Sequence, residues 1–230
     1  MYKYLLWDID GTLLDFAAAE KCAIRALFDK YNLGACSDEM ISSYAKINKK
    51  YWEALERGEM TKPQILVGRF VEFFESINVD TSIAENFNTD YQLTLGDYVV
   101  FEDNAINTLE SEKGKYRLIA VTNGTKIAQE KKLKTSGLNK YFDSVYISED
   151  VGFEKPDVRY FDYLFAKENI NNKSECLIIG DSLTSDMLGG NNAGIDTCWY
   201  NPSGKELTGN VNITYEIDNL LSLNTVLKLD

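Results

Sequence analysis

The sequence contains no histidine, and this absence removes several kinds of catalytic site. Ser-His-Asp triads, Cys-His dyads and metal centres with imidazole ligands all require that side chain. Acid–base and metal chemistry would therefore fall to other residues, and the chain is rich in carboxylates, with 36 Asp and Glu.

Cysteine is scarce, and its four positions form no C-x-x-C pair. This spacing disfavours a disulfide framework and a zinc site. We expect reduced, buried thiols in a cytoplasmic protein. The positions are Cys22, Cys36, Cys176 and Cys198.

Long apolar runs are also missing. None approaches the roughly 18 residues that suggest a membrane-spanning helix, and the first apolar run is interrupted by Asp8. We expect no signal peptide and no membrane partner. A hydrophobic content of 44% with 12% aromatic residues is enough for a sizeable folded core.

Positive charge is in the minority, and the formal net charge is −12. Such a chain repels nucleic acid polymers unless a local basic patch outweighs its field. The lysine-rich stretch 131–134 is expected on the solvated face of a helix. An anionic substrate needs a local cation here, which an Asp-rich site for a hard divalent metal can supply.

The most informative stretch is YLLWDIDGTLL, residues 4–14. Its apolar run and the following Gly11 predict a buried strand that enters a loop. Asp8 and Asp10 share a strand face but can diverge once the chain turns. Two acids this close favour a metal-held nucleophile beside a general acid/base. Asp-x-Asp-Gly is also ordinary turn chemistry, and the stretch alone leaves that alternative open.

Residues 16–97 have helical rather than strand character. Apolar spacing and helix-ending glycines predict roughly four helices in this segment. Capping boxes at residues 61–64 and 82–85 are expected to open two of them. Aromatic residues such as Phe70 and Phe73 lie at helical spacing and are expected to pack internally.

From residue 104 helices and strands alternate, which predicts an α/β fold with a parallel sheet covered on both faces. Expected strands are 117–122, 144–147, 176–180, 197–200 and 213–217, and expected helices are 105–113, 126–136, 158–164, 185–192 and 220–227. Ligands bind at the carboxyl ends of such strands. Polar residues gather at four of these ends, in stretches 8–10, 122–124, 154–157 and 180–186, so we expect them on one rim.

The order and spacing of these motifs resemble the haloacid dehalogenase superfamily of phosphohydrolases along nearly the whole chain. Residues 8–13 resemble its first motif, 122–124 its second, 155–156 its third and 180–186 its fourth. The resemblance implies a Rossmann-like three-layer core, residues 1–15 and 98–230, with a helical cap domain inserted at 16–97.

A closer similarity is to the branch of pyrimidine 5′-nucleotidases that also accept noncanonical nucleotides. Residues 180–186 and 189–202 carry it, as does NKKYWEALERG at residues 48–58. The resemblance implies a Mg²⁺-dependent phosphomonoesterase that hydrolyses nucleoside 5′-monophosphates, with pyrimidine bases, through an aspartyl-phosphate intermediate.

The same resemblance implies a role for each matching residue. Asp8 is predicted to attack phosphorus, and Asp10 to protonate the leaving oxygen and then activate water. Mg²⁺ is expected on Asp8, the backbone carbonyl of Asp10 and Asp181, with Asp186 orienting these ligands. Lys155 is expected to balance the acids and to hold Asp8 and the phosphate.

Phosphate and base contacts complete the predicted site. Thr122 and the backbone N–H of Asn123 are expected to bind phosphate oxygens. Trp52 and Glu53 are candidate contacts to the base, with ordinary helix packing as the alternative. The cap is expected to close over the core and to exclude water.

Other functions fit the same motifs. A sugar-phosphate or phosphoglycolate phosphatase and a phosphomutase would use the same scaffold, and a non-catalytic binding or regulatory module is the alternative from another class. A dehalogenase is disfavoured, because the position of Asp10 is not acidic in dehalogenases of this superfamily. The expected partner is a small phosphorylated metabolite, bound by a monomer or homodimer.

Overall fold

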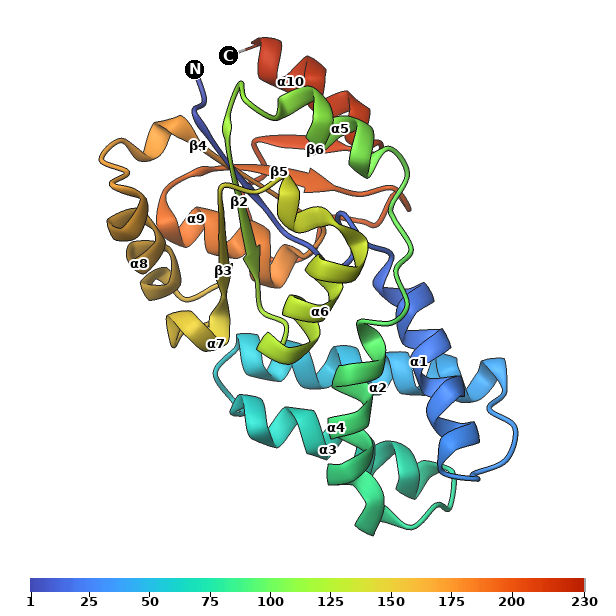
Figure 1. The fold of residues 1–230 in the computed structure, drawn as a ribbon. Helices are drawn as coiled ribbons and strands as arrows, with labels where there is room; N and C mark the ends of the chain where they lie inside the picture. The colour runs from blue at the N-terminus through green and yellow to red at the C-terminus, as the bar shows by residue number, and fades with distance from the viewer. Residues whose placement is uncertain (230) are drawn as a thin grey trace.

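The computed structural model describes residues 1–229 and contains a six-stranded parallel sheet in the order β3-β2-β1-β4-β5-β6 (Figure 1). β1 lies inside the sheet, where Trp7 pairs with Ala120 of β2 and Ile179 of β4. The predicted strands are confirmed, although the last begins at Tyr215 rather than at residue 213. The strands are β1 (Tyr4–Trp7), β2 (Arg117–Thr122), β3 (Ser144–Ile147), β4 (Cys176–Gly180), β5 (Asp196–Tyr200) and β6 (Tyr215–Ile217).

Helices cover both faces of the sheet, which confirms the three-layer α/β fold. Successive side chains of β1 point to opposite faces, so Leu5 and Trp7 enter one core cluster and Leu6 the other. The first cluster includes residues of α5 (Ala105–Glu112), α6 (Lys126–Ser136) and α10 (Leu223–Leu229). The second includes residues of α7 (Ser148–Val151), α8 (Val158–Glu168) and α9 (Leu188–Ala193).

The insertion after β1 forms the four predicted helices, at the opposite end of the molecule from both termini (Figure 1). It has a hydrophobic cluster of its own, in which Phe70 packs against Tyr44, Phe87 and Tyr91 with ring centroids 5.0–5.2 Å apart. Apolar burial of this kind stabilises a helical unit far more than helix propensity does. The helices are α1 (Phe16–Lys30), α2 (Asp38–Glu56), α3 (Lys62–Ser76) and α4 (Ala84–Leu95).

Two predicted helix starts differ in outcome. The capping box at Thr61 and Gln64 is confirmed. The box at residues 82–85 is wrong, because the Asp80 side chain accepts from the Ser82 N–H and starts a 3₁₀ turn over Thr81–Ile83 that leads into α4.

Two further expectations need correction. The predicted helix 185–192 divides into a π-helical turn over Leu183–Met187 and α9. Cys22 is exposed and Cys36 is half-buried, whereas Cys176 and Cys198 sit buried within strands of the sheet. In the described part of the chain, none of the helices has the length and apolar character needed to cross a membrane.

Phe70 provides a test of the insertion's core. The ring is fully buried, so Phe70→Ala is expected to lower the free energy of unfolding by about 3–5 kcal/mol, measured by urea denaturation. The exposed Leu93 on α4 is the control, and Leu93→Ala should change stability by no more than about 0.5 kcal/mol. Equal losses of stability in the two variants would contradict the assignment of Phe70 to the core of the insertion.

Candidate active site

The site begins where β1 ends. The backbone N–H of Asp8 still bonds to the Ile179 carbonyl of β4 at 2.9 Å, and the chain then turns at Gly11. Gly11 has a φ of +90°, and a Cβ there would lie 2.8 Å from Oδ1 of Asp181. Glycine is therefore required twice over, for the backbone conformation and for the close approach to Asp181.

Three carboxylates converge on this turn. Asp8, Asp181 and Asp186 each place an oxygen within 4.8 Å of the others. The Lys155 ammonium group, only 1% exposed, donates to Asp8 at 2.8 Å, to Asp186 at 2.6 Å and to the Val121 carbonyl at 2.9 Å. One buried cation thus links residues that follow β1 and β4 to the end of β2.

In this cluster three carboxylates face one lysine, and both burial and the neighbouring charges shift the pKa values. Burial raises the pKa of Asp8 well above its usual range, and Asp186 adds to the rise while Lys155 opposes it. Burial and then Asp186 raise the pKa of Asp181 to about 7. Burial lowers the pKa of Lys155, but Asp186 and Asp8 outweigh this effect and leave it raised. A hard divalent cation with oxygen ligands fits these residues, since it would supply the missing positive charge.

Thr122 and Asn123 stand beside Lys155, as predicted for one rim. The Asn123 amide donates to the Lys155 carbonyl at 2.7 Å and accepts from the Lys155 N–H at 2.8 Å. The buried Thr122 hydroxyl accepts from the Gly124 N–H at 3.1 Å. The side chain of Asn123 therefore fixes the loop that carries Lys155.

Asp10 diverges from Asp8 and faces α6. Its two carboxylate oxygens accept from Gln129 at 2.7 Å and from Lys132 at 2.6 Å. Lys132 is 2% exposed, so the expectation that residues 131–134 lie together on a solvated face is wrong for this lysine. The reason is that α6 packs with this side toward the end of β1 and meets a carboxylate there.

Two adjoining cavities are lined by residues of this site. A cavity of about 180 Å³ is lined by Thr122, Asn123 and Trp52 of α2, together with the acidic cluster formed by Asp8, Asp181 and Asp186. A larger cavity of about 750 Å³ shares Asp10 and Trp52 with it and extends between the insertion and the sheet. Glu53 lines only the larger one and lies 3.7 Å from Lys49 and 3.9 Å from Arg57.

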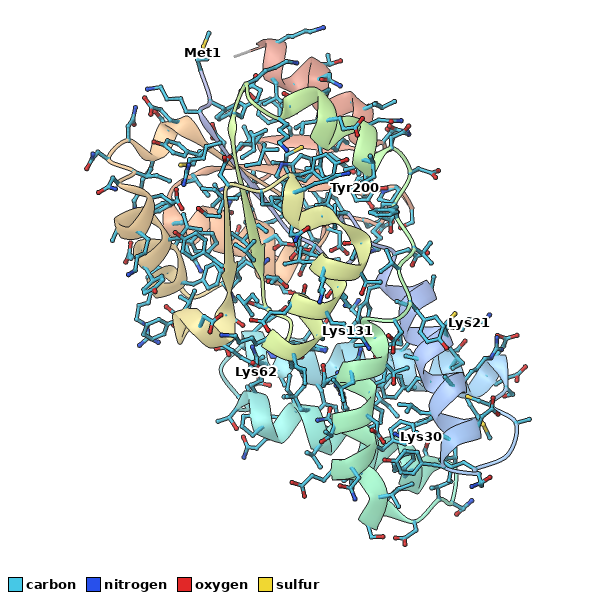
Figure 2. The ribbon with its side chains drawn as sticks, viewed as in Figure 1. Met1, Lys21, Lys30, Lys62, Lys131 and Tyr200 are labelled. Carbon is cyan, nitrogen blue, oxygen red and sulfur yellow. The ribbon has the colours of Figure 1, made fainter. Side chains whose placement is uncertain are left out.

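The insertion contacts the sheet-bearing part through polar groups, of which Lys62 is buried and Glu56 is half-buried. Lys62, at the start of α3, reaches across the junction (Figure 2) and donates to the Asn123 carbonyl at 3.0 Å and to Ser148 at 2.6 Å. Glu56, at the end of α2, accepts from the Thr184 hydroxyl at 2.6 Å. Helices from the insertion thus touch the same loops that carry the acidic cluster.

Sequence reasoning missed several of these residues. Lys62, Gln129 and Lys132 belong to none of the four motifs at the strand ends. Lys62 lies inside a capping box and Lys132 inside the lysine-rich stretch, and neither pattern indicates a buried contact. Glu56 lies inside the stretch 48–58, where no local pattern distinguishes it from its neighbours. Only the packing of the insertion against the sheet reveals them, because their partners are distant in sequence.

Glu56 gives a pH prediction. Burial raises the pKa of its carboxyl group from the ordinary 4.5 to about 7. The folded state therefore binds more protons, so the stabilisation is complete below about pH 4.5 and is lost as the pH rises through about 7. Relative to wild type, Glu56→Gln should gain about 1–3 kcal/mol in unfolding free energy between about pH 5 and pH 8. Urea denaturation of both proteins in EDTA measures this, and a pH-independent difference would contradict it.

The sequence profile of the haloacid dehalogenase-like hydrolases matches residues 5–200. The HAD-hydrolase YfnB of Bacillus subtilis is 37% identical over 229 residues, which cover 100% of this chain and 97% of YfnB. The crystal structure of its orthorhombic form, described as bound to magnesium and as revealing interdomain movement, has a TM-score of 0.92 at 36% identity and covers 98% of both chains.

Two further relatives have names that state a substrate class. The pyrimidine 5′-nucleotidase PynA of Streptococcus pneumoniae is 36% identical and covers 94% of this chain and 91% of its own. The pyrimidine 5′-nucleotidase YjjG of Escherichia coli is 29% identical and covers 98% of each. The profile match and these similarities show that the chain belongs to the haloacid dehalogenase-like hydrolase family.

Proposed function

We propose that the protein is a Mg²⁺-dependent phosphomonoesterase that hydrolyses pyrimidine nucleoside 5′-monophosphates through an aspartyl-phosphate intermediate. One observation carries the proposal: the Asp8 carboxylate, held by Lys155, lines a small cavity together with Thr122 and Asn123. The cavity combines a nucleophile with groups suited to phosphate oxygens. The names of PynA and YjjG support the pyrimidine nucleotide as substrate class.

Asp8 is the proposed nucleophile. One of its oxygens forms a bond to phosphorus as the bond from phosphorus to the leaving oxygen breaks, and Asp10 gives its proton to that oxygen. Water then attacks the phosphorus of the acyl phosphate while Asp10 takes the water proton, which frees phosphate and Asp8. Lys155 and Thr122 are proposed to stabilise the charge that develops on the phosphoryl oxygens.

Asp10 is proposed to act from a fixed position. It lines both cavities, and Lys132 and Gln129 each hold one of its oxygens. A carboxyl group held by two donors loses less freedom when it meets the leaving oxygen. Lys132 and Gln129 are therefore proposed as positioning residues.

The acidic cluster is proposed to hold Mg²⁺. Asp8, Asp181 and the backbone carbonyl of Asp10 would be the ligands, and when bound the ion would offset the charge of the phosphate. Asp186 is proposed to orient them, since Lys155 and the Ser182 N–H already occupy its two oxygens. The magnesium named for the related YfnB structure supports this choice of ion.

Residues 16–97 are proposed to act as a cap domain on a core made of residues 1–15 and 98–230. A hydrophobic cluster separate from those of the sheet supports this division. Phe16 and Trp52 line both cavities, which suits contact with a flat base, and Glu53 is proposed to contact the nucleoside in the larger one. Closure of the cap would exclude water from the reacting phosphate.

Phosphate release tests the proposed reaction. Released phosphate is measured with UMP, dUMP, dTMP, sugar phosphates and phosphoglycolate, in Mg²⁺ and in EDTA. We expect Mg²⁺-dependent release that favours the nucleotides and falls at least about 10³-fold in Asp8→Asn. Preference for a sugar phosphate would contradict the substrate class, and conversion of substrate without phosphate release would indicate a mutase.

The Lys132–Asp10 contact gives a second prediction. Lys132→Met should lower kcat by about 10-fold to 100-fold with little change in KM, because it frees the carboxyl group of Asp10. Lys132→Arg should retain most of kcat, since it restores a donor. Lys134→Met, at an exposed position on the same helix, is the control. A rise in KM at constant kcat would contradict the positioning role.

A further inference from the structure

A buried carboxylate faces the larger cavity and has no part in the proposed reaction. Glu20 on α1 is 4% exposed and lines this cavity together with Asn48 and Trp52. Its Oε2 accepts from Asn48 at 2.7 Å and from Tyr91 at 3.1 Å. Within residues 1–229, the other carboxylate oxygen, Oε1, has no hydrogen-bond partner. It is not fully buried, so it is open to the cavity that Glu20 lines.

Arg69 fixes the orientation of the Asn48 side chain that bonds to Glu20. The guanidinium group is 1% exposed and donates to Oδ1 of Asn48 at 2.7 Å. Because arginine has only donors, the amide oxygen of Asn48 must face it and the amide nitrogen must face Glu20. Glu20 therefore offers the cavity an acceptor, and Asn48 keeps a second N–H beside it.

We propose that Glu20 is a specificity-determining residue that accepts a hydrogen bond from the N3–H of a uracil or thymine base, with Asn48 donating to a neighbouring carbonyl of the base. This inference rests on the proposed function, since it assigns the base that the same site selects. Uracil and thymine present the N3–H donor between two carbonyl acceptors. This edge is complementary to the Glu20 acceptor and the Asn48 donor beside it.

Cytosine is disfavoured at this position. With the phosphate anchored near Asp8, the cytosine ring would place the N3 lone pair against Oε1 of Glu20, and both groups are acceptors. A site built to bind a donor rejects an analogue that lacks it, because its buried polar group is left unpaired. Discrimination therefore comes from Glu20 rather than from cavity size.

The ionisation of Glu20 sets the assay conditions. Burial raises the pKa of Glu20 to about 7, while Tyr91, Arg69, Asn48 and Lys132 limit the rise. An assay at about pH 8 keeps the group largely a carboxylate, and so a pure acceptor.

Glu20→Gln tests the assignment directly. The amide oxygen of the new side chain would take the bonds from Asn48 and Tyr91, which turns an NH₂ group toward the cavity. An acceptor becomes a donor, so kcat/KM for UMP should fall about 10-fold to 100-fold, and CMP should lose much less. The measured ratio of UMP to CMP turnover should fall at least about 10-fold. Glu39→Gln, at an exposed position on α2, is the control and should leave that ratio unchanged.

A substrate pair tests the same contact in the wild-type protein. 3-Methyluridine 5′-monophosphate lacks the N3–H, whereas 5-methyluridine 5′-monophosphate keeps it and carries a methyl group of equal size. The 3-methyl compound should be turned over at least about 10-fold less efficiently than the 5-methyl compound. This comparison decides the question even if Glu20→Gln does not fold.

The outcomes separate the two proposals. If wild type hydrolyses UMP but tolerates the 3-methyl group, or if Glu20→Gln folds and keeps the UMP to CMP ratio, the role of Glu20 is wrong and the nucleotidase proposal stands. If wild type hydrolyses p-nitrophenyl phosphate but no nucleotide, the proposed function fails and the Glu20 assignment fails with it.

Discussion

The buried ammonium group of Lys155 is the constraint on which the rest of the active site depends. It bonds to Asp8 after β1, to Asp186 after β4 and to the backbone carbonyl of Val121 near the end of β2. Carboxylates this close together in a buried site repel one another strongly. A single lysine offsets only part of that charge, which leaves the rim suited to a further cation.

The glycines at the rim follow from the same crowding. A Cβ at Gly11 would strike Asp181, and one at Gly180 would strike the carboxylate of Asp186. The chain can bring its acids together only where its backbone carries no side chain. The first and fourth motifs therefore contain glycine for the packing of the carboxylates and not only for a turn.

A polar network extends this order into the helical insertion. Arg69 holds both Asn48 and Asn88, Gln92 donates to Asn88, and the Thr125 hydroxyl near the second motif donates to Gln92 at 2.7 Å. Because every member has a defined donor or acceptor role, the network orients Asn48, which faces the larger cavity. The insertion is thus joined to the loop after β2 by a hydrogen bond from Thr125 to Gln92.

The sequence by itself determined the α/β alternation, the helical insertion and the four motifs, since these depend on periodicity, caps and strand ends that are local in the chain. It placed Asp8, Thr122, Lys155 and Asp181 on one rim because parallel strands end together. Only the tertiary structure decided the partners of Asp10 on α6, the junction at Lys62 and the open oxygen of Glu20. Each of these depends on which faces of separate helices meet, and helix periodicity alone carries no information about the partner that covers a buried polar side chain.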